Sequence, residues 1–268
     1  MRLFVTGLRC LRLTGHILYA LLVACVFPKL GTRCQQWVMQ DWSVKLLDIL
    51  NVKTQAVGTG FKARPHGSLL AANHISWLDI FVINASTPSR FVAKSEVGAW
   101  PLLGWLVRQS GTLFIRRQYK RDAFRVHRAI ANFIAKGEDV ALFPQGTSSD
   151  GAAPVRFHSA LLQGAIDARA GVQPLAIYYH DGTGRPAMEV AFVGDMTFLH
   201  SLWKILCLPT LTVHLTYLPT IACAETTRRE LAIRAQDAVN AVLAEHHRRS
   251  ADSPPPELHG LQAQWGTP

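Results

Sequence analysis

From Phe61 onward, short runs of apolar residues alternate with segments that have the length and pattern of helices. The clearest apolar run is Ser68–Ala72, which follows Pro65 and Gly67 and has the length of a buried strand. Such alternation is typical of an α/β fold with a largely parallel central sheet flanked by helices. We predict strands at residues 68–72, 90–93, 139–143, 174–179, 188–193 and 211–217, and helices at residues 77–86, 98–109, 120–136, 158–170 and 227–248.

The N-terminal segment has the features of a membrane anchor. Residues Ile17–Phe27 are almost wholly apolar, and the longer stretch Leu11–Leu30 has roughly the 20 residues that a spanning helix needs. That stretch also includes Arg12, His16 and Lys29, so we expect a helix that lies in one leaflet. A single span and an ordinary buried helix are the alternatives. A signal peptide would need a cleavage site, and no convincing one follows the apolar run.

A second helix is predicted at Gln36–Val52, whose broad apolar face could complete an N-terminal helical hairpin. At the other end of the chain, Pro254–Pro256 opens a polar segment without an apolar pattern. We therefore divide the chain into N-terminal membrane-associating helices at 1–55, an α/β domain at 56–249 and a disordered tail at 250–268.

The composition narrows the class of partner. A formal net charge of +10 favours binding to polyanions, which include nucleic acid, anionic lipid and acidic carrier proteins. A hydrophobic share of 49% and the lack of a recognisable nucleic-acid motif favour a lipid surface over nucleic acid. The five cysteines form no CxxC pair, so the sequence predicts neither a zinc site nor a disulfide framework.

Polar residues begin where the predicted strand at 68–72 ends. Ser76 followed by Asp79 has the spacing of a helix N-cap with an acidic residue at the third helical position. His74 in the preceding loop can fold back toward the first turn, where Asp79 would set its tautomer and basicity. Such a pair is the arrangement of a general base. The same spacing also arises by chance, and a capping box needs no catalytic histidine, so the spacing leaves both interpretations open.

A second polar segment follows the predicted strand at 139–143 in the same way. Gln145 comes directly after that strand, as His74 comes after the strand at 68–72. The carboxyl ends of parallel strands gather at one edge of an open α/β sheet, where ligands bind. We therefore expect His74 and Gln145 to belong to one shared site.

Four segments occur along the chain in an order that resembles a known family. They are Asn73-His74-Ile75-Ser76-Trp77-Leu78-Asp79, Gly111-Thr112-Leu113-Phe114-Ile115-Arg116-Arg117, Phe143-Pro144-Gln145-Gly146-Thr147 and Val172-Gln173-Pro174-Leu175. Their order and rough spacing resemble the motifs of the glycerolipid acyltransferase family, the group that contains the lysophosphatidate acyltransferases. The resemblance covers about residues 65–220. Phe91–Glu96, followed by Pro101 and Gly104, is similar to the family's segment between its first two motifs.

The resemblance implies transfer of a fatty acyl group from a thioester to the hydroxyl of a lysolipid. The thioester is a co-substrate, on coenzyme A or acyl carrier protein, and no cofactor or metal is expected. By the same match, His74 is the base and Asp79 its orienting partner. The expected substrate-binding residues are Arg117 at the anionic head group, together with Asn73, Lys94, Phe143, Pro144, Gln145, Gly146 and Thr147. Lys94 is equally a candidate surface ion. We expect a location at the bacterial inner membrane, with the catalytic domain on the cytoplasmic side.

One position departs from the family pattern and leaves the acceptor open. Where the family usually has Phe-Pro-Glu-Gly-Thr, Gln145 keeps the side-chain length but loses the charge and gains a donor. Lysophosphatidate is the default acceptor. Ser148–Gly151 and Ser76–Ile80 also look similar to bacterial members that acylate lyso-ornithine lipid, which has no phosphate.

Three other mechanisms or roles are alternatives to direct acyl transfer. A non-catalytic lipid-binding protein would explain the change at Gln145, and a thioester hydrolase would use His74 to activate water. A covalent acyl-enzyme is not expected, because the Gly-x-Ser-x-Gly motif of a serine nucleophile is absent from the sequence.

Overall fold

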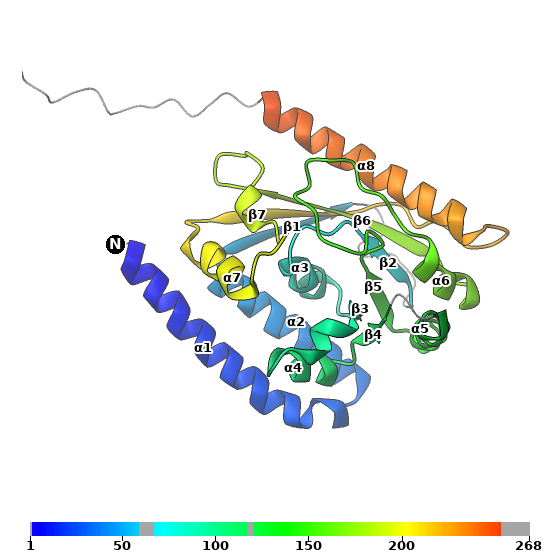
Figure 1. The fold of residues 1–268 in the computed structure, drawn as a ribbon, viewed down its shortest axis with the longest axis horizontal. Coiled ribbons are helices and arrows are strands. Elements are labelled where there is room, and N and C mark those ends of the chain that lie inside the picture. The colour runs from blue at the N-terminus through cyan, green and yellow to red at the C-terminus, as the bar shows by residue number, and fades with distance from the viewer. Residues whose placement is uncertain (1, 59–66, 117–119, 253–268) are drawn as a thin grey trace, which may run out of the picture.

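The computed structural model describes residues 2–58, 67–116 and 120–252. Within these ranges, seven strands form one sheet in the order β1-β7-β6-β2-β5-β3-β4 (Figure 1). Every neighbouring pair is parallel except β6 and β7, which run antiparallel, so the predicted largely parallel sheet is confirmed. The strands are β1 (Val52–Gly58), β2 (Leu69–Ala72), β3 (Ser89–Lys94), β4 (Leu113–Ile115), β5 (Asp139–Leu142), β6 (Val172–His180) and β7 (Leu211–Tyr217).

Helices cover both faces of the sheet, as Figure 1 shows. Alternate residues of a strand point to opposite faces, and β2 divides accordingly. Leu70 and Ala72 pack with α1, α2, α3 and α7, whereas Leu69 and Ala71 pack with α5, α6 and α8. The helices are α1 (Arg2–Val26), α2 (Thr32–Ile49), α3 (Leu78–Ser86), α4 (Leu103–Gln109), α5 (Lys120–Ala135), α6 (Gln163–Asp167), α7 (Phe198–Cys207) and α8 (Arg228–Asp252).

The strand predicted at 188–193 is wrong. Met188–Val190 forms a 3-10 turn, η4, and the Phe192 amide then donates to the Ile75 carbonyl at 2.9 Å. Val190 and Ala191 are buried in the core beside α3 and α7. Val190 and Ala191 are therefore buried by packing beside the loop that follows β2, and not by pairing in the sheet, while Met188 and Val193 are exposed.

Several other predicted bounds differ from the structure. The helix predicted at 36–52 ends at Ile49, and the chain turns into β1, a strand that was not predicted. The expected domain boundary between residues 55 and 56 lies inside β1. β4 was also missed. The helix predicted at 158–170 is a 3-10 turn followed by the short α6, and the helix predicted at 98–109 begins at Leu103. α8 continues to Asp252, past the predicted start of the tail, and residues 253–268 lie outside the described residues.

The second N-terminal helix is part of the core. Leu46, Leu47 and Leu50 are almost fully buried, and α2 packs along α3. Arg90 on β3 donates to Glu138 at 2.8 Å and to the Gln35 side chain on α2 at 2.5 Å. α2 is thus fixed to the sheet by apolar contacts and by a largely buried polar network.

Polar side chains hold α1 against the rest of the protein. Arg9 donates to the carbonyls of Leu206, Leu208 and Pro209 at 3.0, 2.6 and 3.2 Å, where α7 ends. Arg12 pairs with Asp48 on α2, and His16 stacks on Trp42 with a ring-centroid distance of 4.5 Å. Among the described residues, only Phe4–Lys29 is a helical stretch long and apolar enough to cross a bilayer, a criterion of length and composition.

Candidate active site

The loop between β2 and α3 is fixed to the sheet by Asn73. Its side-chain nitrogen donates to the Ile177 carbonyl at 2.9 Å, and its side-chain oxygen accepts from the Ile177 amide at 2.7 Å. Asn73 therefore pairs with β6 as a strand residue would, although it lies beyond the end of β2. Because Asn73 is buried and both of its amide groups are occupied, its contacts favour a structural role over the expected substrate contact.

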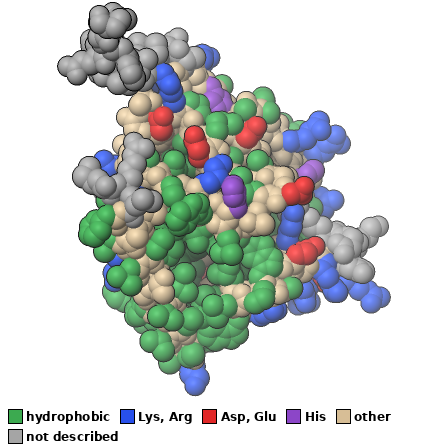
Figure 2. Space-filling view, turned by 60° about the vertical axis from the view of Figure 1, so that its left-hand side comes forward, with side chains coloured by type: hydrophobic (Ala, Val, Ile, Leu, Met, Phe, Trp, Pro, Cys, Tyr) green, Lys and Arg blue, Asp and Glu red, His purple; other side chains and the backbone are tan. Residues whose placement is uncertain are grey.

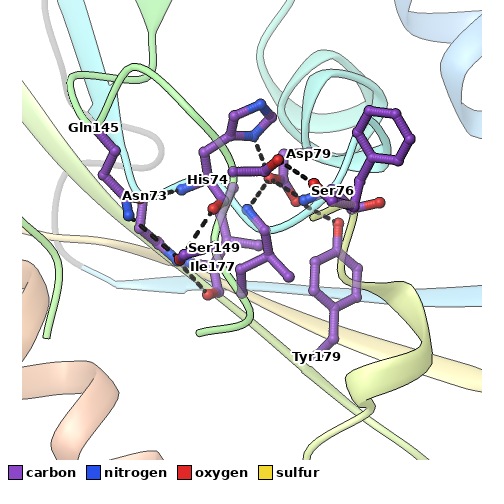
Figure 3. A network of polar contacts seen from close by, with 11 residues as sticks. Asn73, His74, Ser76, Asp79, Gln145, Ser149, Ile177 and Tyr179 are labelled. Carbon is purple, nitrogen blue, oxygen red and sulfur yellow. Dashed lines mark hydrogen bonds and ion pairs between the residues drawn. The ribbon is translucent and has the colours of Figure 1, made fainter. Parts of the chain in front are cut away.

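Asp79 is the centre of the site and is fully buried. Its Oδ2 accepts from His74 Nδ1 at 2.8 Å, from the Ile75 amide at 2.7 Å and from the Ser76 amide at 2.9 Å. Its Oδ1 accepts from the Tyr179 hydroxyl at 2.7 Å, so Asp79 lies between His74 and Tyr179 (Figure 3). The sequence thus located the His74–Asp79 contact correctly.

The predicted N-cap is only half present. Asp79 does reach back to the Ser76 amide, as the acidic member of a capping box would. α3 begins at Leu78, however, and the Ser76 hydroxyl is buried without a hydrogen-bond partner in the described part of the chain. The helix entry is held by the carboxylate, which binds two successive backbone amides and the imidazole at once.

The geometry sets the tautomer of His74. A carboxylate oxygen only accepts, so Nδ1 carries the proton that faces Asp79, and Nε2 is left with a lone pair. The imidazole stacks on Phe143 with ring centroids 4.0 Å apart, and the His74 side chain is 21% exposed. Nε2 has no hydrogen-bond partner among the described residues. The arrangement can therefore accept a proton from a substrate hydroxyl.

Gln145 binds the backbone of His74. Its Oε1 accepts from the His74 amide at 2.6 Å, and its Nε2 donates to the Ser149 hydroxyl at 3.3 Å. The Ser149 amide in turn donates to the His74 carbonyl at 2.9 Å. An amide N–H needs an acceptor opposite it, so the oxygen end of Gln145 is the end that faces His74. Gln145 and Ser149 together hold the His74 backbone on both sides.

This arrangement predicts that a leucine at position 145 impairs catalysis and a glutamate does not. Gln145→Leu leaves the His74 amide without its acceptor. We expect kcat to fall by about tenfold, because a buried polar group without a hydrogen-bond partner costs about 1–3 kcal/mol. In Gln145→Glu, one oxygen can still accept from His74 and the other from Ser149, so kcat should stay within about threefold.

Initial rates of acyl transfer and thermal unfolding of both variants check this prediction. Gln163→Leu on α6 is the matched control, since that glutamine also bonds a side chain within its own segment, Asp167, but lies outside the site. Full activity of Gln145→Leu would contradict the assigned role of the Gln145 oxygen.

The strand order brings the other predicted residues to one edge. β2, β5, β3 and β4 are consecutive neighbours, and their carboxyl ends carry His74, Phe143–Thr147, Lys94 and Arg116, respectively. The predicted convergence of His74 and Gln145 is therefore confirmed. Lys94 is exposed and has no ion-pair partner among the described residues, whereas Arg116 pairs with Asp122 at 2.7 Å. Arg117 lies outside the described residues.

The remaining residues of the Phe143–Thr147 segment shape the loop. Pro144 and Gly146 are buried, and the Pro144 carbonyl accepts from the His158 amide at 2.9 Å. Gly146 has φ of 81°, a conformation that favours glycine because a side chain would be strained there. Thr147 is exposed beside them. Of this segment, Phe143 and Gln145 contact His74 directly.

Two contacts of the site were missed by the sequence analysis. The sequence places Ser149 only in the segment Ser148–Gly151 after the Phe143–Thr147 motif, and Tyr179 only in the predicted strand at 174–179. Tyr179 carried a weak signal, because a tyrosine at the end of a buried strand needs a partner for its hydroxyl. The pairing of that hydroxyl with Asp79, 100 residues earlier in the chain, had no local signal.

Comparisons with known proteins identify the family of this chain. A model of the Acyltransferase family matches residues 53–178. A 1-acyl-sn-glycerol-3-phosphate acyltransferase of Neisseria meningitidis is 36% identical over 190 residues, which cover 70% of this chain and 74% of that protein. A lyso-ornithine lipid O-acyltransferase of Pseudomonas aeruginosa is 35% identical over 212 residues, which cover 79% of this chain and 80% of that protein.

The fold also has a solved counterpart. The crystal structure of the 1-acyl-sn-glycerophosphate (LPA) acyltransferase PlsC from Thermotoga maritima superimposes with a TM-score of 0.61. The match covers 88% of this chain and 97% of the other at 19% identity, and so concerns the fold. The family match, the extent of the similarity to the Neisseria and Pseudomonas proteins, and the shared fold lead to one conclusion: this chain belongs to the Acyltransferase family and is an acyltransferase.

Proposed function

We propose that this acyltransferase is a lysophosphatidate O-acyltransferase of phospholipid biosynthesis. Its acyl donor is acyl-CoA or the acylated form of acyl carrier protein. The observation that carries the proposal is the His74 imidazole, held through Nδ1 by buried Asp79, with its Nε2 free of bonds to described residues. Lys94, a cation without an ion-pair partner in the described ranges, lies at the same edge of the sheet. A base and a cation there suit an acceptor that has a hydroxyl and an anionic head group.

In the proposed mechanism, the acceptor attacks the thioester directly. His74 Nε2 removes the hydroxyl proton as the oxygen forms a bond to the acyl carbon. The tetrahedral intermediate then breaks its C–S bond, and the thiolate leaves and takes the proton from the imidazolium. The products are the ester and the free thiol. Asp79 stabilises the imidazolium and keeps the ring oriented throughout. The proposal requires neither a covalent acyl-enzyme nor a resident metal or cofactor.

Arg117, Phe143 and Thr147 complete the proposed substrate contacts. We assign Arg117 to the head group by its position in the matched motif, next to Arg116 at the end of β4. Phe143 lies against His74, and Thr147 is exposed at the same edge, so both can contact the acceptor. Gln145 acts on the acceptor indirectly, through the backbone of His74.

A second candidate acceptor is lyso-ornithine lipid. The similarity to the Pseudomonas protein extends over more of this chain than the similarity to the Neisseria protein does. Ser148 and Ser149 continue the Phe143–Thr147 segment. Both belong to the loop at the site, and Ser149 contacts His74 there. Lysophosphatidate stays our first choice, because Lys94, which has no ion-pair partner in the part of the chain that the structure describes, and a net charge of +10 favour a phosphate.

One experiment separates these acceptors. The purified, detergent-solubilised protein is given radiolabelled acyl-CoA or acyl carrier protein with lysophosphatidate and lyso-ornithine lipid side by side. Phosphatidate as the main product supports the proposal, and ornithine lipid as the main product supports the second candidate. Release of free fatty acid without a lysolipid would identify a hydrolase, and no turnover with any donor would favour a non-catalytic lipid-binding protein.

We also propose that α1 lies in one leaflet of a membrane, parallel to its surface. The polar residues Arg9, Arg12 and His16 face the protein and hold α1 along α7 and α2, contacts that a helix leaving the protein to span a bilayer would break. The outward side is apolar: Leu11 and Leu22 are 70% and 73% exposed. Such a helix buries its apolar side in the leaflet.

Neighbouring helices extend the apolar surface of α1. Leu199 and Trp203 on α7 are exposed, and so are Trp105 on α4 and Trp100 just before that helix. α1 contacts both α4 and α7. Figure 2 turns this side of the molecule forward and shows apolar side chains gathered over it. Tryptophan is enriched at membrane interfaces. Because the proposed donors are cytoplasmic, we place this surface on the cytoplasmic side of the bacterial inner membrane.

Charges on α1 are expected to weaken membrane binding. The double variant Leu11→Glu/Leu22→Glu should lower the fraction bound to liposomes at fixed lipid by at least about tenfold, since burying each leucine is worth about 1.5–3 kcal/mol. Ile233→Glu on α8, an exposed apolar residue on the opposite side of the sheet, is the control and should bind as the unaltered protein does. Co-sedimentation measures both, and unchanged binding of the double variant would contradict the leaflet proposal.

A further inference from the structure

The Tyr179 hydroxyl makes the only hydrogen bond that Asp79 Oδ1 accepts within the described residues. The O–O distance is 2.7 Å, Tyr179 is 3% exposed and Asp79 is fully buried. The other oxygen, Oδ2, accepts from His74 and from two backbone amides. The two ends of the carboxylate are therefore held by different parts of the protein: one by its own loop, the other by β6.

A carboxylate held at one oxygen can still rotate about its Cβ–Cγ bond. A donor on the second oxygen removes that freedom and keeps Oδ2 directed at His74 Nδ1. The same donor compensates for the loss of water around a buried anion, which is costly when such a group has too few partners. Burial, and then the charge and hydrogen bond of Asp79, raise the pKa of the Tyr179 hydroxyl well above its ordinary value, so the tyrosine keeps its proton and stays a donor.

β6 contacts both ends of the segment that carries His74. The backbone of Ile177 pairs with the Asn73 side chain at the start of the loop, and the Tyr179 side chain pairs with Asp79 in the first turn of α3, just after the loop ends. Figure 3 shows these two contacts on either side of His74. β6 thus sets the separation of the loop's ends.

We propose that Tyr179 is a positioning residue for acyl transfer, which acts by orienting Asp79 so that His74 holds its proton on Nδ1 and presents Nε2 to the acceptor. The inference rests on the proposed catalytic roles of His74 and Asp79. Tyr179 does not contact the reacting atoms in this assignment. Its removal should therefore slow turnover and leave substrate affinity unchanged.

The test compares Tyr179→Phe with Tyr178→Phe in the full-length, detergent-solubilised protein. Tyr178 is the neighbouring residue and is also buried, but its hydroxyl bonds Ser250 at 2.7 Å on the opposite face of the sheet. Each variant loses one hydrogen-bonded oxygen atom. We expect kcat of Tyr179→Phe to fall by about tenfold or more with an unchanged KM, as for other residues that support a catalytic group. Tyr178→Phe should keep its kcat, and the two Tm values should agree within about 4 °C.

A double-mutant cycle links the effect to Asp79. In the Asp79→Asn background, Tyr179→Phe should lower kcat by no more than about twofold, because the carboxylate on which it acts is already gone. 4-Aminophenylalanine at position 179 keeps the ring and an N–H donor and should restore kcat to within about threefold of the unaltered protein. This variant also decides the question if Tyr179→Phe does not fold.

Three results would overturn the inference: equal kcat for Tyr179→Phe and Tyr178→Phe, a full additional loss in the Asp79→Asn background, or no recovery with 4-aminophenylalanine. His74→Ala separates this failure from a failure of the proposed function. If His74→Ala is inactive while Tyr179→Phe is fully active, only the role of Tyr179 is wrong. If His74→Ala itself turns over, the catalytic assignment on which the inference depends is wrong.

Discussion

Replacing His74 with alanine is expected to lower kcat for acyl transfer by about 10³-fold, within the range that a general base contributes. The acceptor hydroxyl is a poor nucleophile until its proton is removed, and Nε2 of His74 is the group placed to remove it. The fold should survive, because the imidazole is partly exposed and its main packing partner, Phe143, stays in place. Initial rates with radiolabelled acyl donor measure the effect.

His158→Ala is the matched control for this prediction. His158 is exposed, and within the described residues its side chain makes no hydrogen bond, ion pair or ring contact with the site; its backbone bond to Pro144 is kept in alanine, so kcat and Tm should stay unchanged. Circular dichroism and thermal unfolding of both variants separate a chemical defect from a folding defect. Turnover by His74→Ala at a rate near that of the unaltered protein would rule out its role as the base.

Replacing Asp79 with asparagine is expected to lower kcat by at least about 10²-fold, since loss of the orienting carboxylate lowers kcat by about 10⁴-fold in a Ser-His-Asp triad. An asparagine oxygen can still accept from the Ile75 and Ser76 amides, but its NH2 group then faces the Tyr179 hydroxyl, and the negative charge beside His74 is gone. The imidazolium formed during turnover loses its counter-ion, because the amide oxygen that still accepts from His74 Nδ1 carries no negative charge.

Asp150→Asn is the control, because it removes one negative charge from a nearby carboxylate that does not bond His74. Asp150 lies on the exposed loop that continues the Gln145–Ser149 segment, and its side chain accepts a hydrogen bond from the Ala152 amide. Its replacement should therefore change neither kcat nor KM. The same rate assay and thermal unfolding apply. An Asp79→Asn variant as active as Asp150→Asn would show that His74 needs no carboxylate, and both Asp79 and Tyr179 would lose their assigned functions.

Three of the correctly predicted strands differ in one respect from those that were missed. β2, β5 and most of β6 are buried along their whole length, and apart from Asp139 and Gln173 their buried residues are apolar. β1 is an edge strand in which Val52 alone is fully buried, and β4 has only three residues. Neither leaves an apolar run long enough to distinguish it from a loop. In the opposite direction, residues 188–193 have the apolar content of a strand, but Val190 and Ala191 are buried without pairing in the sheet and Met188 and Val193 are exposed.

The α/β class, the family and the contact between His74 and Asp79 can be predicted from the sequence alone, because each depends on residues close together in the chain or on the order of motifs. How that contact is held depends on residues that the fold brings together. Gln145 lies 71 residues from His74, Ile177 lies 104 from Asn73, and Tyr179 lies 100 from Asp79. Local patterns follow from backbone periodicity and capping, whereas these distant partners meet because the strand order places β2 between β5 and β6.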